Sequence, residues 1–85
     1  MSEPIMEIDE EGTKRWYLNE KLHREDGPAI ENPNGTKFWY RNGEYHRIDG
    51  PAFEFASGYK EWYINGVEYT KEEYLLLSFF GVNNV

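Results

Sequence analysis

A 23-residue repeat governs what this chain can fold into. Gly12, Gly35 and Gly58 lie 23 residues apart, and each begins a block in which Lys, Trp, Tyr and Asn recur in the same order. After the first two blocks, the segment His-Arg-x-Asp-Gly-Pro-Ala recurs at 23–29 and 46–52, whereas the third block lacks it. A fixed period of this length indicates stacked supersecondary units that cannot bury their apolar surface alone. We therefore expect one domain over residues 1–85.

Each block is typical of a β-hairpin. The aromatic runs of the second and third blocks end at Asn42-Gly43 and Asn65-Gly66. Asn-Gly favours a type I′ turn, because both turn residues take positive φ. Asn19-Glu20 is a weaker signal in the first block, and Asp26-Gly27-Pro28 and Asp49-Gly50-Pro51 predict a bend in the first two units. The predicted fold is mostly β: an antiparallel up-and-down meander of about three 23-residue hairpin repeats.

The repeat period is lost after Tyr69. Thr70 and Glu73 form a capping box, which predicts a C-terminal helix that Gly81 ends. The apolar residues of this helix cover more than one stripe, so we expect it to be buried on the sheet and partly against something else, and to cap the array. The predicted segments are an acidic partial unit at 1–11, repeats at 12–34 and 35–57, a partial repeat at 58–69 and a capping helix at 70–81.

Composition favours an aromatic core in a cytoplasmic protein. Fifteen residues are Trp, Tyr or Phe, whereas Leu, Ile and Val are few. The absence of cysteine excludes a disulfide framework. The sequence has no apolar run long enough to span a membrane, and residues 1–12 lack the basic and apolar regions of a signal peptide.

The net charge of −7 is concentrated at one end of the chain. Residues 1–11 hold five acids and no Lys or Arg, and beyond them the basic residues are interleaved with acids. Direct nucleic-acid binding is therefore not expected, since it needs a basic stripe. As an alternative function, an acidic end of this kind could mimic nucleic acid through Glu7, Asp9, Glu10 and Glu11.

The pattern Gly-x-Lys-x-Trp-Tyr-x-Asn-Gly-x-x-His over residues 12–69 resembles the MORN repeat, whose units are stacked β-hairpins. With His-Arg-x-Asp-Gly-Pro-Ala after the hairpin, it is similar to a variant found in bacterial, phage and large-virus proteins. Glu20 departs from the pattern at the hairpin glycine. The resemblance implies a non-catalytic scaffold for protein contacts and names no partner.

Neighbouring residues of a strand point to opposite faces, which separates the Trp-Tyr pairs. Trp16, Trp39 and Trp62 are expected on one face, as the core, and the tyrosines on the other. The tyrosines are either half-exposed decoration or, with nearby arginines, a recognition surface of the kind favoured at protein interfaces. The candidate binding residues are Tyr17, Tyr40, Tyr63, Arg15, Arg24, Arg41 and Arg47.

The repeated polar residues are better explained by structure than by catalysis. His23 and His46 occupy equivalent positions, so we expect each imidazole, with Asp26 or Asp49, to bond the backbone of its own bend. Gly27 and Gly50 belong to the same bends. No nucleophile lies near a repeated base and no phosphate-binding loop is evident, so an enzyme, a metal site and a cofactor are not expected.

The sequence thus predicts a small non-enzymatic protein-binding module, and its resemblance suggests a phage or bacterial accessory inhibitor of a host or defence protein. Three alternatives stay open: an acidic nucleic-acid mimic, a nucleotide or small-ligand sponge, and a self-assembling structural protein. The sponge would use His23, Arg24, His46 and Arg47, whereas self-assembly into a homodimer would use open edge strands and the apolar helix.

Overall fold

The computed structural model describes residues 3–79 of the chain. Within this range, ten short strands precede one helix. The elements are β1 (Ile5–Ile8), β2 (Lys14–Leu18), β3 (Lys21–Leu22), β4 (Ile30–Glu31), β5 (Lys37–Phe38), β6 (Tyr40–Arg41), β7 (Glu44–Tyr45), β8 (Phe53–Glu54), β9 (Lys60–Ile64), β10 (Val67–Tyr69) and α1 (Lys71–Phe79).

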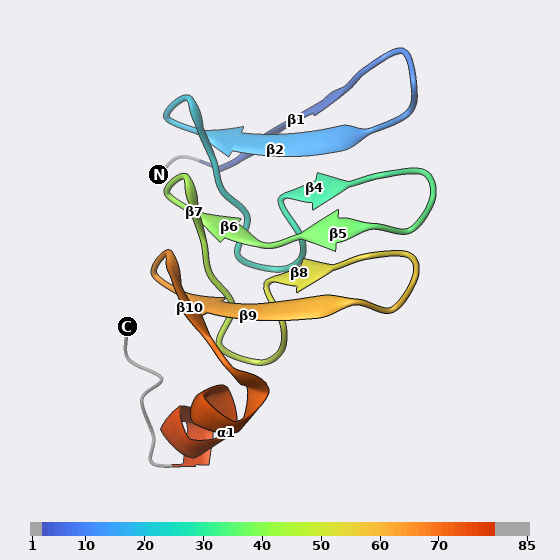
Figure 1. The fold of residues 1–85 in the computed structure, drawn as a ribbon. Helices are drawn as coiled ribbons and strands as arrows, with labels where there is room; N and C mark the ends of the chain where they lie inside the picture. Colours follow the sequence, from blue (N-terminus) through green and yellow to red (C-terminus); the bar gives the residue numbers. More distant parts are fainter. Residues whose placement is uncertain (1–2, 80–85) are drawn as a thin grey trace.

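The strands form antiparallel ladders that follow the chain from one end of the molecule to the other (Figure 1). The main sheet has the order β1-β2-β4-β5-β8-β9-β10, with β3 paired to β2, and the hairpin β6-β7 forms a separate pair. The mostly β, antiparallel class with one short C-terminal helix is therefore confirmed. The bends predicted at the two Asp-Gly-Pro segments precede β4 and β8, which begin two residues after Pro28 and Pro51, and neither proline can donate to a ladder.

The hairpin turns have the geometry that the Asn-Gly pairs predict. Asn42 and Gly43 have φ of 53° and 84°, and Asn65 and Gly66 have 50° and 80°. The weaker signal at Asn19-Glu20 folds in the same way, with φ of 52° and 68°. Glu20 thus adopts a left-handed conformation that disfavours residues with a Cβ.

Equivalent backbone hydrogen bonds recur 23 residues apart. Trp16 N–H donates to Ala29 O and Trp39 N–H donates to Ala52 O, both at 2.8 Å. Bonds between successive hairpins recur as well, from Arg24 N–H to Tyr40 O and from Arg47 N–H to Tyr63 O, both at 3.2 Å. Successive segments of the chain are therefore joined by the same backbone contacts.

The helix closes the end of the sheet next to β9 and β10 (Figure 1). Its capping box is present as predicted: Thr70 N–H donates to Glu73 Oε1 at 2.8 Å, and Glu73 N–H donates to Thr70 Oγ1 at 3.1 Å. One side of the helix is buried on the sheet, where Tyr74 is 4% exposed and its ring centroid lies 6.4 Å from that of Trp62, whereas Leu75 and Leu76 on the rest of its surface are more than half exposed. The predicted stop at Gly81 lies outside the described residues.

The expected core of large aromatic rings is not formed. Among the described residues, none of the large side chains is fully buried, and the tryptophans are only half-buried. The buried residues are mostly small or polar and comprise Thr13, His23, Ala29, Thr36, Ala52, Ile64 and Tyr74. The molecule measures 41 × 36 × 17 Å, and so thin a sheet leaves both of its faces partly open to water.

Candidate functional site

The two faces of the sheet carry different rings. Cross-strand partners share a face, so the pairs Phe38–Phe53, Tyr40–Tyr45 and Tyr63–Glu68 lie on one face. The alternation along each strand puts Trp16, Trp39 and Trp62 on the other. Indoles and phenols of the Trp-Tyr pairs are therefore segregated.

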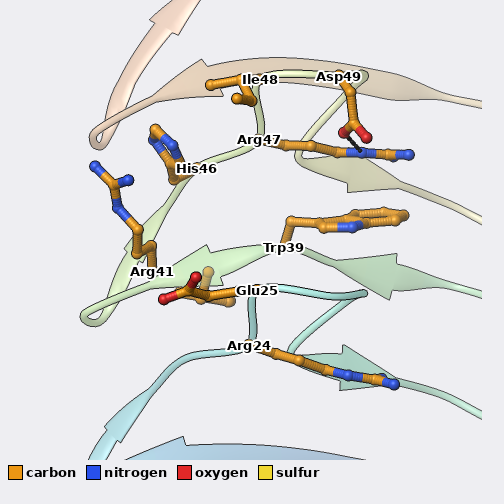
Figure 2. A pocket seen from close by; sticks show the side chains of 9 residues that line it. Arg24, Glu25, Trp39, Arg41, His46, Arg47, Ile48 and Asp49 are labelled. Carbon is orange, nitrogen blue, oxygen red and sulfur yellow. Dashed lines mark hydrogen bonds and ion pairs between the residues drawn. The ribbon is translucent and has the colours of Figure 1, made fainter. Parts of the chain in front are cut away.

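On the face that carries the tryptophans, arginines stack on the indoles. Arg24 Cζ lies 3.8 Å from the ring centroid of Trp16, and Arg47 Cζ lies 3.8 Å from that of Trp39. Figure 2 draws Trp39 with Arg47 on one side and Arg24 on the other. Cation–π attraction favours this arrangement, because the indole ring is the best acceptor for a guanidinium.

Each of these guanidinium groups is also held by the bend that follows it. Arg47 Nε donates to Asp49 Oδ1 at 2.9 Å, and Arg47 Nη1 donates to Pro51 O at 3.0 Å and to Glu54 Oε2 at 3.1 Å. Arg24 makes the equivalent three bonds. A Cβ on Gly27 or Gly50 would lie 3.0 or 2.8 Å from the guanidinium carbon. The glycines thus leave the space in which the arginines sit.

The sequence interpretation required Arg24 and Arg47 to lie beside the tyrosines. These contacts hold both arginines on the other face instead. Both side chains are about one-fifth exposed and are occupied by indoles, carboxylates and a backbone carbonyl on the opposite face. Arg41 bonds to Asn65 Oδ1 at 2.9 Å, in the turn of the next hairpin. The aspartates of the bends therefore bond arginine rather than the backbone, which corrects the expectation for Asp26 and Asp49.

The histidines join one hairpin to the next. Asn42 N–H donates to His23 Nδ1 at 3.0 Å, and Asn65 N–H donates to His46 Nδ1 at 2.9 Å. Nδ1 of each imidazole therefore accepts from the backbone of a turn 19 residues further along the chain and not from that of its own bend, contrary to the sequence prediction. His23 Nε2 also lies 3.1 Å from Glu25 Oε2, a side chain of its own bend. Burial, and secondarily the charge of Arg41, lowers the pKa of His46, which favours the neutral ring that can accept this bond.

Seven rings are in continuous contact on the opposite face, which we call the aromatic face. Tyr45 lies between Tyr40 and Tyr63, with centroid distances of 4.6 and 4.8 Å. Phe53 lies between Phe38 and Phe55, at 4.6 and 4.5 Å. The members of the aromatic face are Phe38, Tyr40, Tyr45, Phe53, Phe55, Tyr59 and Tyr63.

Carboxylates border the aromatic face next to β9 and β10. Tyr59 Oη donates to Glu61 Oε2 at 2.8 Å, and Tyr63 Oη donates to Glu61 Oε1 at 3.3 Å. The bond to Glu61 and its charge raise the pKa of Tyr59. Burial, followed by the charges of Glu61 and Glu68, raises the pKa of Tyr63 to about 12. The phenols therefore stay neutral donors beside negative charge.

Two of the predicted tyrosines, Tyr40 and Tyr63, lie in this cluster, whereas the cross-strand partner of Tyr17 is Leu22 and not another ring. The sequence interpretation missed five of the seven rings because it followed only the Trp-Tyr pairs. The alternation along the strands could have identified them, since Phe38 and Tyr40, and Phe53 and Phe55, are two residues apart.

The four acidic residues predicted to act together as an acidic end lie in different surroundings, some on β1 and some in the turn that follows it. Asp9 Oδ2 accepts a bond from Arg15 Nη1 at 2.9 Å, and Asp9 Oδ1 accepts the backbone N–H groups of Glu11 and Thr13. The bond from Arg15 is the main cause of the lowered pKa of Asp9. Glu7 lies on β1, whereas Glu10 and Glu11 lie in the turn. Asp9 is therefore engaged in holding this turn.

A hollow of about 270 Å³ opens between two hairpins on the face of the sheet that carries Trp16, Trp39 and Trp62, which we call the indole side (Figure 2). Both positive and negative side chains border it, and its lining residues are Arg24, Glu25, Trp39, Tyr40, Arg41, His46, Arg47, Ile48 and Asp49. Because its arginines already bond to the protein, the hollow offers little uncompensated charge to a ligand.

Comparison with protein families, with curated proteins and with solved structures finds no match to this chain. Across residues 3–79, no three His, Asp or Glu side chains come together in a way that could hold a metal ion. The same part of the chain contains no helix with the length and hydrophobicity needed to cross a bilayer.

Proposed function

We propose that this chain is a non-enzymatic binding module that docks its aromatic face onto a basic protein surface. The observation that supports this most directly is the continuous row of seven half-buried or exposed rings. Water remains in contact with Phe55 and Tyr59, which are 41% and 53% exposed. Tyrosine and phenylalanine are favoured in the centres of protein interfaces, because they bury a large area at a small entropic cost.

Charge supports a basic partner. Glu61 and Glu68 border the rings, and the chain as a whole carries −7. Arg15 shares this face, since it is the cross-strand partner of Ile30, which in turn is the partner of Phe38, but it is paired with Asp9. Lysine or arginine side chains of a partner would find both carboxylates and ring faces here, and such cation–π contacts are worth roughly 0.5–2 kcal/mol each.

A module that binds without chemistry of its own acts by covering its partner. The resemblance of the repeated motif to accessory proteins of bacteria and phages supports a role as an inhibitor of a host or defence protein. In that role one copy of the module would have to bind each copy of the partner. The loss of partner activity would then be proportional to the fraction of partner molecules that are bound.

The test compares capture of proteins from a bacterial lysate by the native chain and by two single variants. Phe55→Ala and Tyr59→Ala remove exposed rings, and Lys37→Ala is a matched control on the opposite face. A partner that supports the proposal binds the native chain and Lys37→Ala alike but binds the ring variants about tenfold or more weakly. It also binds less tightly at high salt. Equal affinity for all four proteins would refute the docking role of this face.

A further inference from the structure

The sheet has one end closed and one end open. At the C-terminal end α1 packs beside β9 and β10. At the other end, β1 is the outermost strand, and within the described chain no strand lies on its outer side (Figure 1). An open edge presents unpaired N–H and C=O groups to any extended segment, so natural proteins usually block such edges with lysine, proline, a bulge or a covering element.

The backbone groups that face outward from β1 can be assigned from the register. Thr13, Arg15 and Tyr17 pair with β1 and its extension, opposite Asp9, Glu7 and Ile5. Trp16, between them, points its backbone groups away from β1: its N–H donates to Ala29 O, and its C=O accepts from His23 N–H. Because bonding directions alternate along a strand, Glu7 bonds towards β2, whereas Met6 and Ile8 direct their N–H and C=O groups away from the sheet.

The side chains of this edge are apolar and exposed. Ile5, Met6 and Ile8 are 70%, 44% and 58% exposed, although they belong to a regular strand. Met6 and Ile8 lie on the indole side, opposite Trp16 and Lys14. An added strand would therefore place every second side chain beside Met6 and Ile8, where apolar residues gain most from burial.

The charge of the same edge is negative. Residues 1–11 contain five acids and no Lys or Arg. Glu7 lies directly opposite Arg15, but Arg15 bonds to Asp9 at 2.9 Å. The side chains of an added strand that fall beside Glu7 are therefore favoured when they are Lys or Arg.

We propose that β1 is a docking edge for an extended segment of a partner protein, in which apolar residues alternate with Lys or Arg. Strand addition supplies affinity through main-chain bonds and selectivity through alternate side chains. A second copy of this chain is a poor occupant, because antiparallel pairing of two β1 strands through Met6 and Ile8 places Glu7 opposite its own copy. This inference concerns a different surface from the aromatic face and does not depend on it.

The experiment measures amide hydrogen exchange of the full chain by NMR, with and without short synthetic peptides. One peptide alternates valine and lysine, a second alternates valine and glutamate, and a third is the lysine peptide interrupted by proline. With saturating lysine peptide, we expect exchange at Met6 and Ile8 to slow by about tenfold or more. Exchange at Glu7 should change little, because its N–H already bonds to β2.

Variants of β1 test the same contact. Ile8→Pro removes an outward donor while leaving the bonds to β2, and it should abolish the protection by the lysine peptide. If that variant does not fold, Glu7→Gln should weaken the peptide several-fold at low salt, with Leu75→Ala at the far helix as the control.

Three results would overturn the proposal: unchanged exchange at Met6 and Ile8 with saturating lysine peptide, equal protection by the glutamate peptide, or protection at these amides that depends on protein concentration alone.

Discussion

Replacing Gly50 with alanine tests whether the guanidinium of Arg47 is fixed between an indole and a bend. A Cβ at this position would lie 2.8 Å from Arg47 Cζ and 3.1 Å from Nε and Nη1. Gly50 is not among the glycines with positive φ, so alanine introduces a steric conflict there without left-handed backbone strain. The guanidinium would have to retreat by roughly 0.6 Å to regain ordinary van der Waals contact.

That retreat is costly because four contacts hold the group in place. Trp39 stacks on it at 3.8 Å, and the three hydrogen bonds of Arg47 span 2.9–3.1 Å. Overpacking of this kind costs about 1–3 kcal/mol. The lower backbone entropy of alanine in the unfolded chain offsets about 0.4–1 kcal/mol of that loss. We expect a net destabilisation of about 1–2 kcal/mol, or a fall in Tm of about 4–8 °C for each kcal/mol.

Urea denaturation followed by tryptophan fluorescence measures the effect in two backgrounds. In the native background Gly50→Ala should lower the free energy of unfolding as stated. In an Arg47→Met background, where the apolar stem remains but the guanidinium is absent, the same substitution should be neutral or slightly stabilising. An equal cost in both backgrounds would refute the reasoning. Gly27→Ala, at 3.0 Å from Arg24 Cζ, should be the milder case.

Three further substitutions follow from the fold. The pKa of His46 lies below its ordinary 6.5, so the contribution of His46 to stability is present above pH 6.5 and is lost as the pH falls through the lowered value. His46→Asn retains an acceptor for Asn65 N–H and should flatten that part of the pH profile of unfolding. An unchanged pH profile in this variant would contradict the assignment. Tyr74→Phe removes both hydroxyl bonds to the bend between β7 and β8 and should cost about 1–3 kcal/mol in urea denaturation; a loss near zero would show that the helix is anchored otherwise. Glu20→Gly relieves a left-handed residue at φ 68° and should raise Tm, with a gain of about 0.5–1 kcal/mol, whereas a lower Tm would show that Glu20 makes a contact worth more than its strain.

The local elements were predictable because short-range chemistry determines them. Asn42-Gly43 and Asn65-Gly66 form the expected turns, and Thr70 with Glu73 forms the expected cap. Asn19-Glu20 also turns as expected, although its intrinsic preference is weaker. There the pairing of β2 with β3 stabilises a conformation that the second turn residue disfavours.

The interactions between hairpins were harder to predict because they depend on how neighbouring segments approach each other. An arginine follows its tryptophan by eight residues and precedes a glycine by three in both complete copies, which was a usable sign of Arg–Trp stacking. The link from His23 to the turn at Asn42 spans 19 residues and has no local signature. The extent to which the aromatic rings are buried could not be predicted from the sequence either, since a single-layer sheet leaves its rings half-exposed whatever their hydrophobicity.

The closing of one end by α1 has a consequence for how the molecule comes apart. The ring centroids of Tyr74 and Trp62 lie 6.4 Å apart, and the Tyr74 hydroxyl bonds to the bend before β8. The last hairpin is therefore held by contacts on two sides. The first hairpin has a neighbour on one side alone within the described chain. In an array whose segments contact their nearest neighbours, unzipping begins where a segment has fewest neighbours. We therefore expect thermal fraying to start at β1 and to advance towards the helix, which would make unfolding directional.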